Sequence, residues 1–357
     1  MKTRSSIIGL VAPVPPPNGG MAIQGERLAS LLTEDGFIVH VIPANPSFPG
    51  FVKLFEQLKG FRTVIRFILL LVSLRKLRHV DVVHILAASH LYFFAVVAPT
   101  ILFSKLFGKR VILNYRGGEA DSFFSKHGKW ASPFLVKADV VAVPSVFLAR
   151  VFQKHFSLKC HILPNIADFE IFHFRERVIF APKIIVSRQL ETIYGHTTIL
   201  KGFAKIKKEF PDAVLKIAGE GSLRKELEKL TVDLALEDVE FLGVLTPQKL
   251  SEVYDDSDIM VNASTIDNFP GALIEAFVCG LPVVSSDSGG IPNMITDGKN
   301  GLLFAVDDDH TLADKVKEIV RSPDKARILV SNAKAFAADF SWPVVRHELL
   351  HLYDFKT

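Results

Sequence analysis

Two carboxylates, Asp267 and Glu275, stand eight residues apart in the second half of this 357-residue chain. The segment 259–263 before them has the apolar run of a buried strand, and Pro270-Gly271 marks a break before a helix at 272–279. The backbone N–H groups of that helix's first turn favour an anion such as a diphosphate. Glu275 is placed to accept hydrogen bonds from ribose hydroxyls, and Asp267 from a hydroxyl of a sugar. The spacing predicts a binding site for a sugar nucleotide.

The chain around this break is expected to line the donor part of the site. The residues concerned are Phe269, Pro270, Gly271, Ala272 and Leu273. Two structural alternatives stand beside this interpretation. Asp267 with Asn268 has the composition of a helix-capping turn, and Glu275 that of a solvated helix residue.

The residues after the helix, Gly280 and Gly289-Gly290, complete a pattern that resembles the signature of retaining glycosyltransferase family 4, the glycosyl transferases group 1. Members usually carry two glutamates separated by seven residues; here the first is Asp267, one methylene shorter. The resemblance implies the GT-B fold, an α/β architecture of two doubly wound, Rossmann-like domains that face a cleft. It also implies a nucleoside diphosphate sugar as donor, with Arg188, Asp267 and Glu275 as catalytic residues.

Arg188 directly follows the apolar run 183–187 and resembles the arginine that holds the diphosphate in this family. The family's lysine has no clear counterpart, because the residue before Gly195 is Tyr194. One cation and a helix N-terminus would then stabilise the leaving group. The structural alternative is an ion pair between Arg188 and Glu191.

Two further strand ends resemble the family's backbone shelf for the nucleotide base. They contain Gly219, Gly243 and Val244. Because main-chain groups would recognise the base, the side chains do not reveal which base it is.

In the first half of the chain, the pair Gly19-Gly20 follows the apolar segment 7–12 and precedes a helix at 23–32. Glycine lets a ligand come close to the backbone, and the pair resembles the family's first glycine-rich loop, which lines the acceptor side and contacts donor phosphates. The alternative is a flexible turn. No G-x-G-x-x-G pattern follows this strand, which argues against a dehydrogenase.

Arg116 and the pair Gly117-Gly118 follow the strand expected at 111–114, where many family members place a histidine. A permanent, forked cation at a strand end predicts contact with an anionic acceptor such as a lipid diphosphate. The alternative is an ion pair with Glu119 or Asp121.

Short apolar runs alternate with helical segments along the chain, which is typical of doubly wound parallel sheets. The expected strands are 7–12, 38–42, 80–86, 111–114, 140–143 and 161–163, then 183–187, 213–218, 239–242, 259–262, 282–285 and 301–304. We predict an N-terminal acceptor-side domain at 1–168, a C-terminal nucleotide-sugar domain at 169–341, and a helix at 342–357 that packs back on the first domain. Ligands are expected at the carboxyl ends of the strands.

Charge and cysteine content narrow the class of protein. The net charge of +4 is too small to indicate nucleic acid binding. Cys160 and Cys279 lie far apart, which indicates a reducing compartment and no disulfide framework. Asp256-Ser257-Asp258 has the form of a metal-binding D-x-D motif, but its place before a strand favours a helix stop, and the run 307–309 favours a helix cap. Neither a metal ion nor a cofactor is implied.

The segment 51–78 surrounds an apolar run with basic residues. These are Lys53, Lys59, Arg62, Arg66, Arg75, Lys76 and Arg78, against the single acid Glu56. A basic amphipathic helix predicts docking on an anionic membrane, to which each cation contributes about 1 kcal/mol. The alternative is an ordinary helix that packs its apolar stripe on the sheet. No run reaches the ~18 apolar residues of a spanning helix, so we expect a cytoplasmic protein, peripheral on the inner face of the membrane.

The residues and the resemblance together predict a retaining transferase that moves a hexose from a nucleoside diphosphate sugar to a glycan or lipid-linked acceptor, in cell-surface polysaccharide synthesis. One rival is a sugar-nucleotide epimerase or hydrolase of the same fold, which needs a water-activating group; His90 and Glu119 are the first-domain candidates. Another is an inactive partner that binds nucleotide or membrane, since Asp267, Arg116 and Tyr194 depart from the family pattern.

Overall fold

The computed structural model describes residues 6–16, 19–48, 50 and 59–355. The chain divides into two compact units. The first comprises Met1–Ile166 together with Trp342–Thr357, and the second comprises Ala167–Ser341. The domain boundary predicted after residue 168 lies two residues beyond this division.

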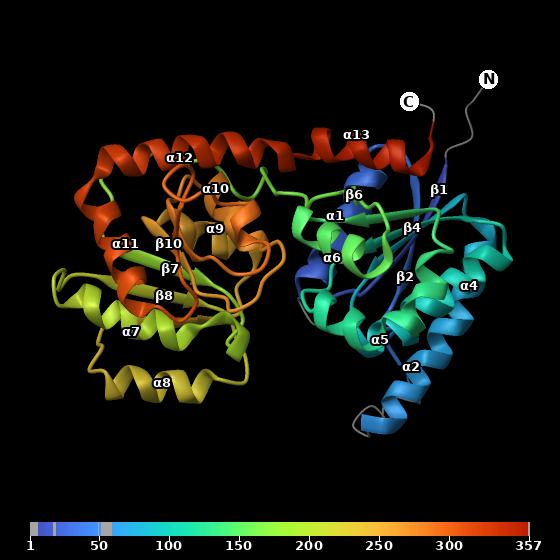
Figure 1. The fold of residues 1–357 in the computed structure, drawn as a ribbon, viewed down its shortest axis with the longest axis horizontal. Helices are drawn as coiled ribbons and strands as arrows, with labels where there is room; N and C mark the ends of the chain where they lie inside the picture. The colour runs from blue at the N-terminus through green and yellow to red at the C-terminus, as the bar shows by residue number, and fades with distance from the viewer. Residues whose placement is uncertain (1–5, 17–18, 49, 51–58, 356–357) are drawn as a thin grey trace. The chain divides into compact units, whose positions relative to one another are not determined.

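The first unit contains a six-stranded parallel sheet with the strand order β2-β1-β3-β4-β5-β6 (Figure 1). Its strands are β1 (Ile7–Ala12), β2 (Ile38–Pro43), β3 (Val82–Ala87), β4 (Arg110–Tyr115), β5 (Val140–Val143) and β6 (His161–Ile162). Every run predicted as a strand in this unit forms one, within two residues at either end.

Helices cover both faces of this sheet. They are α1 (Gly20–Glu34), α2 (Lys59–Leu74), α3 (His90–Tyr92), α4 (Ala98–Leu106), α5 (Ala120–Leu135), α6 (Val146–Phe156) and α13 (Trp342–Tyr353), with a π-helical segment (Phe93–Val97) between α3 and α4. Side chains alternate across a strand, so Val83 and Ile85 join the core beneath α2, α4, α5 and α6. Val82 and Leu86 join the opposite core, beneath α1 and α13. This two-sided burial explains why the strands are apolar at most positions.

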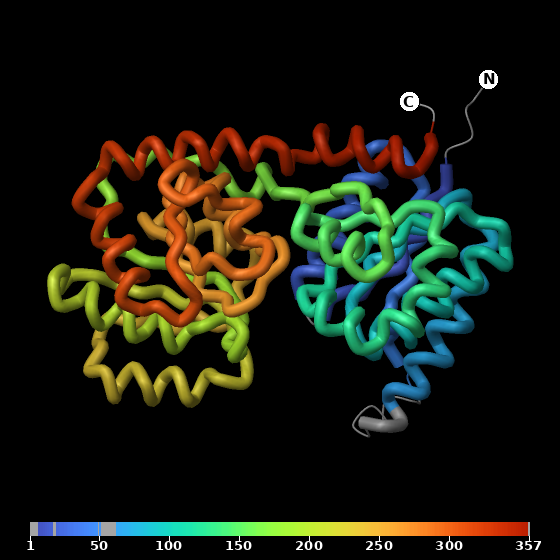
Figure 2. The backbone as a smooth tube through the Cα atoms, viewed as in Figure 1, coloured from blue at the N-terminus to red at the C-terminus, as the bar shows by residue number. Residues whose placement is uncertain are grey.

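The C-terminal helix α13 packs on the first unit, where Figure 2 shows the red end of the chain beside the blue N-terminal strand. Tyr353 Oη lies 2.7 Å from Nδ1 of the buried His84 on β3. Arg110 Nε donates to the carbonyl oxygen of Leu352 at 3.1 Å. A buried histidine, a tyrosine hydroxyl and a strand-edge arginine thus fix the end of the chain to β3 and β4.

The second unit repeats the architecture with the strand order β12-β11-β10-β7-β8-β9, again all parallel (Figure 1). Its strands are β7 (Lys183–Ser187), β8 (Val214–Ala218), β9 (Val239–Gly243), β10 (Ile259–Asn262), β11 (Val283–Ser286) and β12 (Leu302–Phe304). All six had been predicted from the apolar runs.

Helices also cover both faces of the second sheet. They are α7 (His196–Lys207), α8 (Arg224–Asp233), α9 (Pro247–Asp255), α10 (Gly271–Val278), α11 (Asp309–Arg321) and α12 (Pro323–Ala337). One core contains Ile184 and Val186 of β7 under α7, α8 and α11, and the other contains Ile185 under α9, α10 and α12. The predicted cap of α11 is confirmed, because the Asp308 carboxylate accepts hydrogen bonds from the N–H groups of His310 and Thr311.

Arg177 anchors the irregular segment that leads into the second unit. Its buried guanidinium donates from Nε to Ser257 O at 3.0 Å, from Nη2 to Tyr254 O at 2.8 Å and from Nη1 to Cys279 O at 2.7 Å. Asp258 Oδ1 lies 3.4 Å from Nε, and burial lowers the pKa of Arg177. One side chain therefore ties together the ends of α9 and α10 and the start of β10.

Candidate functional site

The second sheet has its topological switch point between β7 and β10. The chain runs from β7 through β8 to β9 on one side, then returns to place β10 on the other side of β7. In open α/β sheets, ligands bind at the carboxyl ends of the two strands that flank such a point. Arg188 directly follows β7, and Asp267 lies in the loop after β10. The structure therefore brings two of the predicted site residues to the expected edge of the sheet.

Arg188 and Asp267 form an ion pair at this edge. Arg188 Nη2 donates a hydrogen bond to Asp267 Oδ2, and each side chain is 13% exposed. The Arg188 guanidinium lies over the Tyr194 ring, 4.3 Å from its centroid. The Tyr194 ring supports the guanidinium without adding a charge.

The alternative ion pair between Arg188 and Glu191 is wrong. Glu191 Oε1 accepts a hydrogen bond from Ser222 N at 2.9 Å, and Oε2 accepts one from Ser222 Oγ at 2.6 Å. Sequence proximity favoured Glu191, but the sheet topology brings Asp267 to Arg188.

The loop that carries Asp267 is held by Gly289-Gly290. Gly290 N donates to Asp267 O at 2.7 Å, and a Cβ on Gly289 would lie 2.0 Å from the same oxygen. Asp267 Oδ1 accepts from Asn268 N at 2.7 Å, whereas the N-cap residue of α10 is Pro270, without a side-chain capping bond. The interpretation of Asp267 as a cap of α10 is therefore wrong.

Glu275 lies on α10, half-buried. Tyr254 Oη, on α9, donates to Glu275 Oε2 at 3.1 Å. Burial raises the pKa of Glu275, while the Tyr254 hydrogen bond and the charge of Arg188 lower it. The interpretation of Glu275 as a solvated helix residue is wrong. Burial also raises the pKa of Tyr254 well above its usual value, so the hydroxyl keeps its proton.

Tyr254 was missed from the sequence, because nothing in its local pattern distinguishes it from a core tyrosine. Its hydroxyl fixes one oxygen of the Glu275 carboxylate, 21 residues away in the chain. A carboxylate held in this way can accept hydrogen bonds from a ligand in a defined direction.

At the first turn of α10, backbone groups are more available for ligand contacts than side chains are. Gly271 begins the helix, and Pro270 precedes it as the N-cap residue. The side chains of Ala272 and Leu273 are buried in the core. Leu273 N donates to Pro270 O at 3.2 Å. Any ligand contact of Ala272 or Leu273 is therefore limited to the backbone.

The remaining predicted donor residues lie at the ends of other strands. Gly219 N, after β8, donates to Gly243 O at 2.8 Å, so these two strand ends form one continuous backbone surface. Val244 follows them and is exposed. The Phe269 ring packs edge-on against Phe340 at 5.4 Å between centroids.

The D-x-D triplet is a helix stop, as predicted. α9 ends at Asp255 and β10 begins at Ile259. Asp256 binds Lys216 and lies 3.7 Å from Lys183 Nζ, and Asp258 pairs with Arg177. In the described ranges, no group of three or more His, Cys, Asp or Glu side chains is arranged to hold a metal ion.

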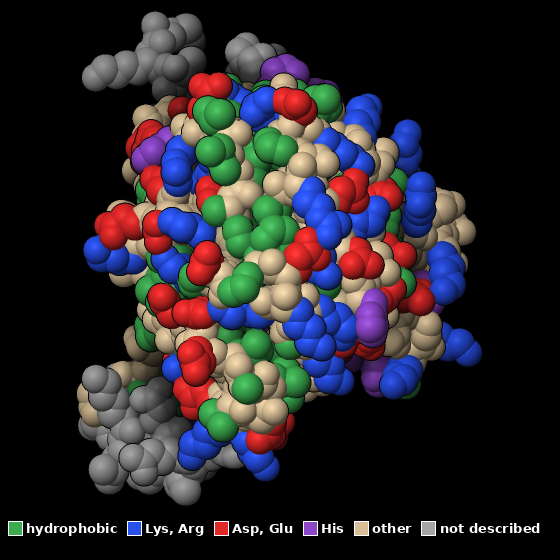
Figure 3. All heavy atoms as spheres, turned by 90° about the vertical axis from the view of Figure 1, so that its left-hand side faces the viewer, with side chains coloured by type: hydrophobic (Ala, Val, Ile, Leu, Met, Phe, Trp, Pro, Cys, Tyr) green, Lys and Arg blue, Asp and Glu red, His purple; other side chains and the backbone are tan. Residues whose placement is uncertain are grey.

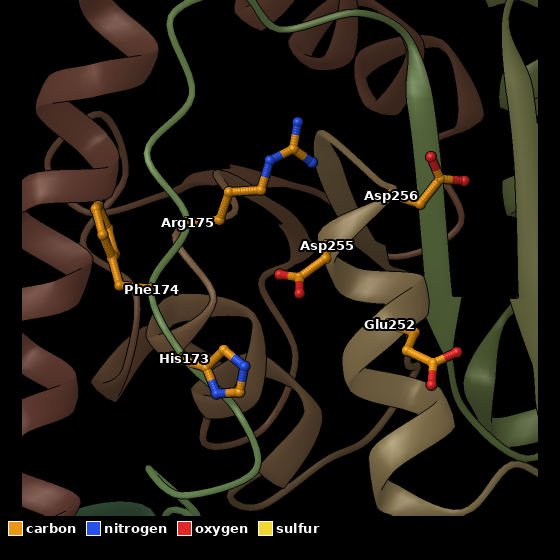
Figure 4. Close-up of a pocket in the computed structure, with 6 residues that line it drawn as sticks. All are labelled: His173, Phe174, Arg175, Glu252, Asp255 and Asp256. Atoms are coloured by element: carbon orange, nitrogen blue, oxygen red, sulfur yellow. The ribbon is translucent and has the colours of Figure 1, made fainter.

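A separate hollow of about 570 Å³ opens beside the last turn of α9 (Figure 4). Its lining residues are His173, Phe174, Arg175, Glu252, Asp255 and Asp256. Since α9 leads into the start of β10, this hollow belongs to the amino-terminal edge of the sheet, opposite the switch point. Three carboxylates would repel a diphosphate, so we do not assign it to the donor.

Arg116 lies at the carboxyl end of β4 in the first unit. Its Nη1 donates to Asn165 Oδ1, and its buried Nε has no hydrogen-bond partner in the described part of the chain. Burial lowers the pKa of Arg116 to about 10. Glu119 instead contacts His90, and Asp121 contacts the α6 side chains Lys154 and His155. The alternative ion pairs of Arg116 with Glu119 or Asp121 are therefore wrong.

The glycines predicted for the first unit follow β1 and β4, two strands that β3 separates in the sheet. Gly19 is the N-cap residue of α1, and Gly20 begins the helix after β1. A Cβ on Gly117 would lie 2.6 Å from Ser89 Oγ, so the loop after β4 packs directly on the loop after β3. Gly118 has open space around the position of a Cβ.

His84 is a buried polar residue that the sequence reasoning missed. Its Nδ1 faces the Tyr353 hydroxyl, and its Nε2 lies 3.1 Å from Asn114 Nδ2. Burial, and then the charge of Arg116, lower the pKa of His84 to about 3. A neutral histidine therefore lies beneath the Arg116 loop and carries no charge at neutral pH.

Helix α2 buries one apolar face and exposes another. Leu70 and Leu74 join the core, whereas Val64, Ile68 and Val72 are 58%, 53% and 51% exposed. Residues 51–58, which include part of the predicted basic segment, lie outside the described residues.

The basic side chains around α2 divide into two kinds. Arg66 is half-buried over the Phe48 ring, 5.7 Å from its centroid. Arg75, Lys76 and Arg78, which follow the helix, are exposed. No helix within the described ranges has the length and apolar character needed to cross a membrane.

The face of the second unit seen in Figure 3 mixes both signs of charge, with hydrophobic side chains between them. Ion pairs join α7 and α11 in this unit: Lys205 Nζ lies 3.0 Å from Asp309 Oδ1, and Lys317 Nζ lies 3.6 Å from Glu209 Oε2. Arg75, Lys76 and Arg78, which follow α2, form an exposed cluster of a single sign, unlike the paired charges of this face.

The fold defines the class of protein: two doubly wound units with parallel six-stranded sheets are the GT-B type of architecture, as predicted. The structure is similar to sucrose-phosphate synthase from Thermosynechococcus elongatus, with a TM-score of 0.78, 18% sequence identity and 98% of each chain covered. It is also similar to the Anabaena protein HepE in complex with UDP, with a TM-score of 0.75, 17% identity, and 97% of this chain and 98% of that chain covered. At these identities the similarity shows the fold alone.

The sequence comparison points in the same direction. Residues 173–336 match the family model described as glycosyl transferases group 1. A D-inositol 3-phosphate glycosyltransferase of Corynebacterium kroppenstedtii is 29% identical over 174 residues, which is 46% of this chain and 39% of the relative. The chain thus spans less than half the length of this curated relative.

Proposed function

We propose that the protein is a retaining glycosyltransferase that moves a hexose from a nucleoside diphosphate sugar to a glycan or lipid-linked acceptor. The observation that carries this proposal is the ion pair of Arg188 and Asp267 beside Glu275, at the switch point of the family-matching unit. The similar structure in complex with UDP, and the relatives named as glycosyltransferases, support the donor class and the reaction type.

In this proposal, Arg188 binds the donor diphosphate. A guanidinium offers two parallel N–H groups to phosphate oxygens, and the Tyr194 ring below it fixes the plane of the fork. The first turn of α10 adds backbone N–H groups with the positive end of the helix dipole. These groups stabilise the negative charge that develops when the diphosphate leaves.

The two carboxylates orient the rest of the donor. Glu275, with one oxygen held by Tyr254, accepts hydrogen bonds from ribose, and Asp267 accepts one from a sugar hydroxyl. The acceptor oxygen forms a bond to the anomeric carbon while the bond from that carbon to the diphosphate oxygen breaks. The acceptor proton passes to the leaving diphosphate on the same face of the sugar. The sugar nucleotide is the only co-substrate, and the step uses no cofactor.

Arg116 is proposed to hold an anionic group of the acceptor. Its guanidinium donates to the amide oxygen of Asn165, and among the described residues its buried Nε has no hydrogen-bond partner. A largely buried cation without a carboxylate partner is unfavourable unless an anion neutralises it. A phosphate or diphosphate of a lipid-linked glycan has the required charge.

Helix α2 is proposed to dock the enzyme on an anionic membrane. The exposed Val64, Ile68 and Val72 would enter the interface, and the basic cluster of Arg75, Lys76 and Arg78 would contact acidic lipid headgroups. A peripheral position on the cytoplasmic face would bring the enzyme to lipid-linked acceptors for polysaccharide synthesis. Charge complementarity selects lipid as the occupant of this surface.

Titration calorimetry with UDP, GDP, ADP and TDP tests the donor site. We expect one diphosphate to bind, and Arg188→Ala to lose at least tenfold in affinity. Arg321→Ala is the matched control, because Arg321 is an exposed arginine at the end of α11 that pairs with Glu209. Equal affinities of wild type and Arg188→Ala for the bound diphosphate would place the phosphate site elsewhere.

A further inference from the structure

A histidine and a glutamate that were weighed separately as water-activating groups form a pair. His90 Nε2 lies 2.5 Å from Glu119 Oε2, and their side chains are 51% and 58% exposed. His90 follows β3, and Glu119 lies in the loop after β4, the neighbouring strand. The first sheet has its switch point between β1 and β3, so the pair stands beside the expected ligand crevice of this unit.

The backbone of His90 is strained. Its φ is +58°, a left-handed conformation that residues with a Cβ rarely adopt. An exposed histidine–carboxylate pair contributes little to stability and is not expected to offset this strain. Strained residues of this kind cluster at functional sites, where the surrounding structure holds them in place.

Contacts of its neighbours with the core fix the position of His90. Ser89 Oγ lies 2.7 Å from the hydroxyl of Tyr115, which is buried in the core. Gly117 packs against Ser89 so closely that a Cβ would overlap its Oγ. The Phe123 ring meets the His90 ring edge-on, with 5.4 Å between centroids. Core residues therefore fix an exposed imidazole in one orientation, as a binding site requires.

We propose that His90, oriented by Glu119, binds the acceptor hydroxyl that receives the sugar. The Glu119 carboxylate accepts the N–H of Nε2, which leaves Nδ1 as a hydrogen-bond acceptor for an O–H group. This is the arrangement of a histidine positioned by a carboxylate, and it serves here to orient a hydroxyl. The inference rests on the proposed glycosyltransferase function and adds an acceptor-binding pair to it.

His90→Gly separates this role from a structural one. Glycine adopts a positive φ without strain, so the variant should melt at the same temperature as wild type or higher. With the imidazole gone, KM for the acceptor should rise at least tenfold, while the affinity for the nucleoside diphosphate stays unchanged. Glu119→Ala should raise the acceptor KM in the same direction. His347→Ala is the matched control, since His347 is another exposed histidine beside a glutamate, 3.6 Å from Glu348.

The assay uses UDP-glucose, UDP-galactose, UDP-N-acetylglucosamine and GDP-mannose as donors, with octyl glycosides and phosphorylated octyl glycosides as acceptors. A raised acceptor KM in His90→Gly, with intact donor binding, supports the inference. An unchanged acceptor KM overturns it and leaves the proposed function standing. If the wild-type enzyme hydrolyses the donor and His90→Gly does not, the pair activates water, and this result also overturns the inference. If wild-type enzyme forms no product with any pair, the proposed function fails together with this inference.

Discussion

Replacing Asp267 by asparagine tests whether its ion pair with Arg188 competes with the donor diphosphate. The two side chains are hydrogen-bonded and only 13% exposed, so the guanidinium cannot offer both prongs to phosphate until the pair opens. A hydrogen bond between charged groups contributes about 1.5–3 kcal/mol, and one to a neutral amide about 1 kcal/mol. The substitution therefore removes roughly 0.5–2 kcal/mol of competition.

That difference corresponds to a roughly 2- to 30-fold tighter binding of the free nucleoside diphosphate. Transfer should change in the opposite direction, because the carboxylate that holds the sugar hydroxyl is lost. We expect turnover of Asp267→Asn to fall at least tenfold while its diphosphate affinity rises. Few substitutions in a binding site improve the affinity for one ligand and impair the reaction of another, so the paired result is diagnostic.

Titration calorimetry with the nucleoside diphosphate, at constant pH and ionic strength, measures the first effect, and initial transfer rates measure the second. Asp238→Asn is the control, because Asp238 also pairs with a cation, Lys207, but on the outer surface of the second unit. Weaker or unchanged diphosphate binding in Asp267→Asn would refute the competition and the assignment of Arg188 as its target.

Three further substitutions or conditions follow from the contacts described above. Tyr254→Phe removes the hydrogen bond that lowers the pKa of Glu275, so the pKa of Glu275 should rise further. The donor affinity of this variant, measured by calorimetry, should fall more at pH 6 than at pH 8. An equal loss at both pH values would contradict the role of ionised Glu275. The pKa of His84 is lowered to about 3, so between pH 6.5 and pH 3 the unfolded chain binds a proton that the folded chain excludes. The free energy of unfolding, measured with urea, should therefore fall as the pH falls from 6.5 toward 3, by at most about 1.4 kcal/mol per pH unit. In His84→Gln it should fall less steeply. Reversing Arg75, Lys76 and Arg78 to glutamate should release the protein from anionic vesicles in a sedimentation assay and leave its diphosphate affinity unchanged. Arg66 is left unchanged in this variant because it packs on Phe48. The control reverses the exposed Lys225 and Lys229 on α8, and that variant should stay bound to the vesicles.

The fold was readable from the sequence because each strand is buried on two faces. Runs such as 183–187 and 259–262 contain apolar residues at both odd and even positions, as a sheet covered by helices on both sides demands. Gly and Pro at their ends mark where the chain leaves the sheet. The order of the strands within each sheet was not predicted, because no single segment of the sequence reveals it.

The candidate site was readable only in part. Arg188 and Asp267 were identified by their places after strands, yet their mutual contact joins residues 79 apart and depends on the crossover that places β10 beside β7. The local spacing instead suggested Glu191 as the ion-pair partner of Arg188. Tyr254 and Arg177 were invisible for the same reason, since the hydrogen bonds that define them reach other elements. The strain at His90 leaves no trace in composition, because it lies in the backbone conformation of a residue type that is common in loops.

Incubation of the wild-type protein with the sugar-nucleotide panel and the octyl acceptors, followed by mass spectrometry and NMR of the product, tests the central claim most directly. The account predicts one glycoside formed for each nucleoside diphosphate released, with the anomeric configuration of the donor retained, and no glycoside from Arg188→Ala. Free hexose alone, an epimerised sugar nucleotide, or a glycoside of inverted configuration would contradict it.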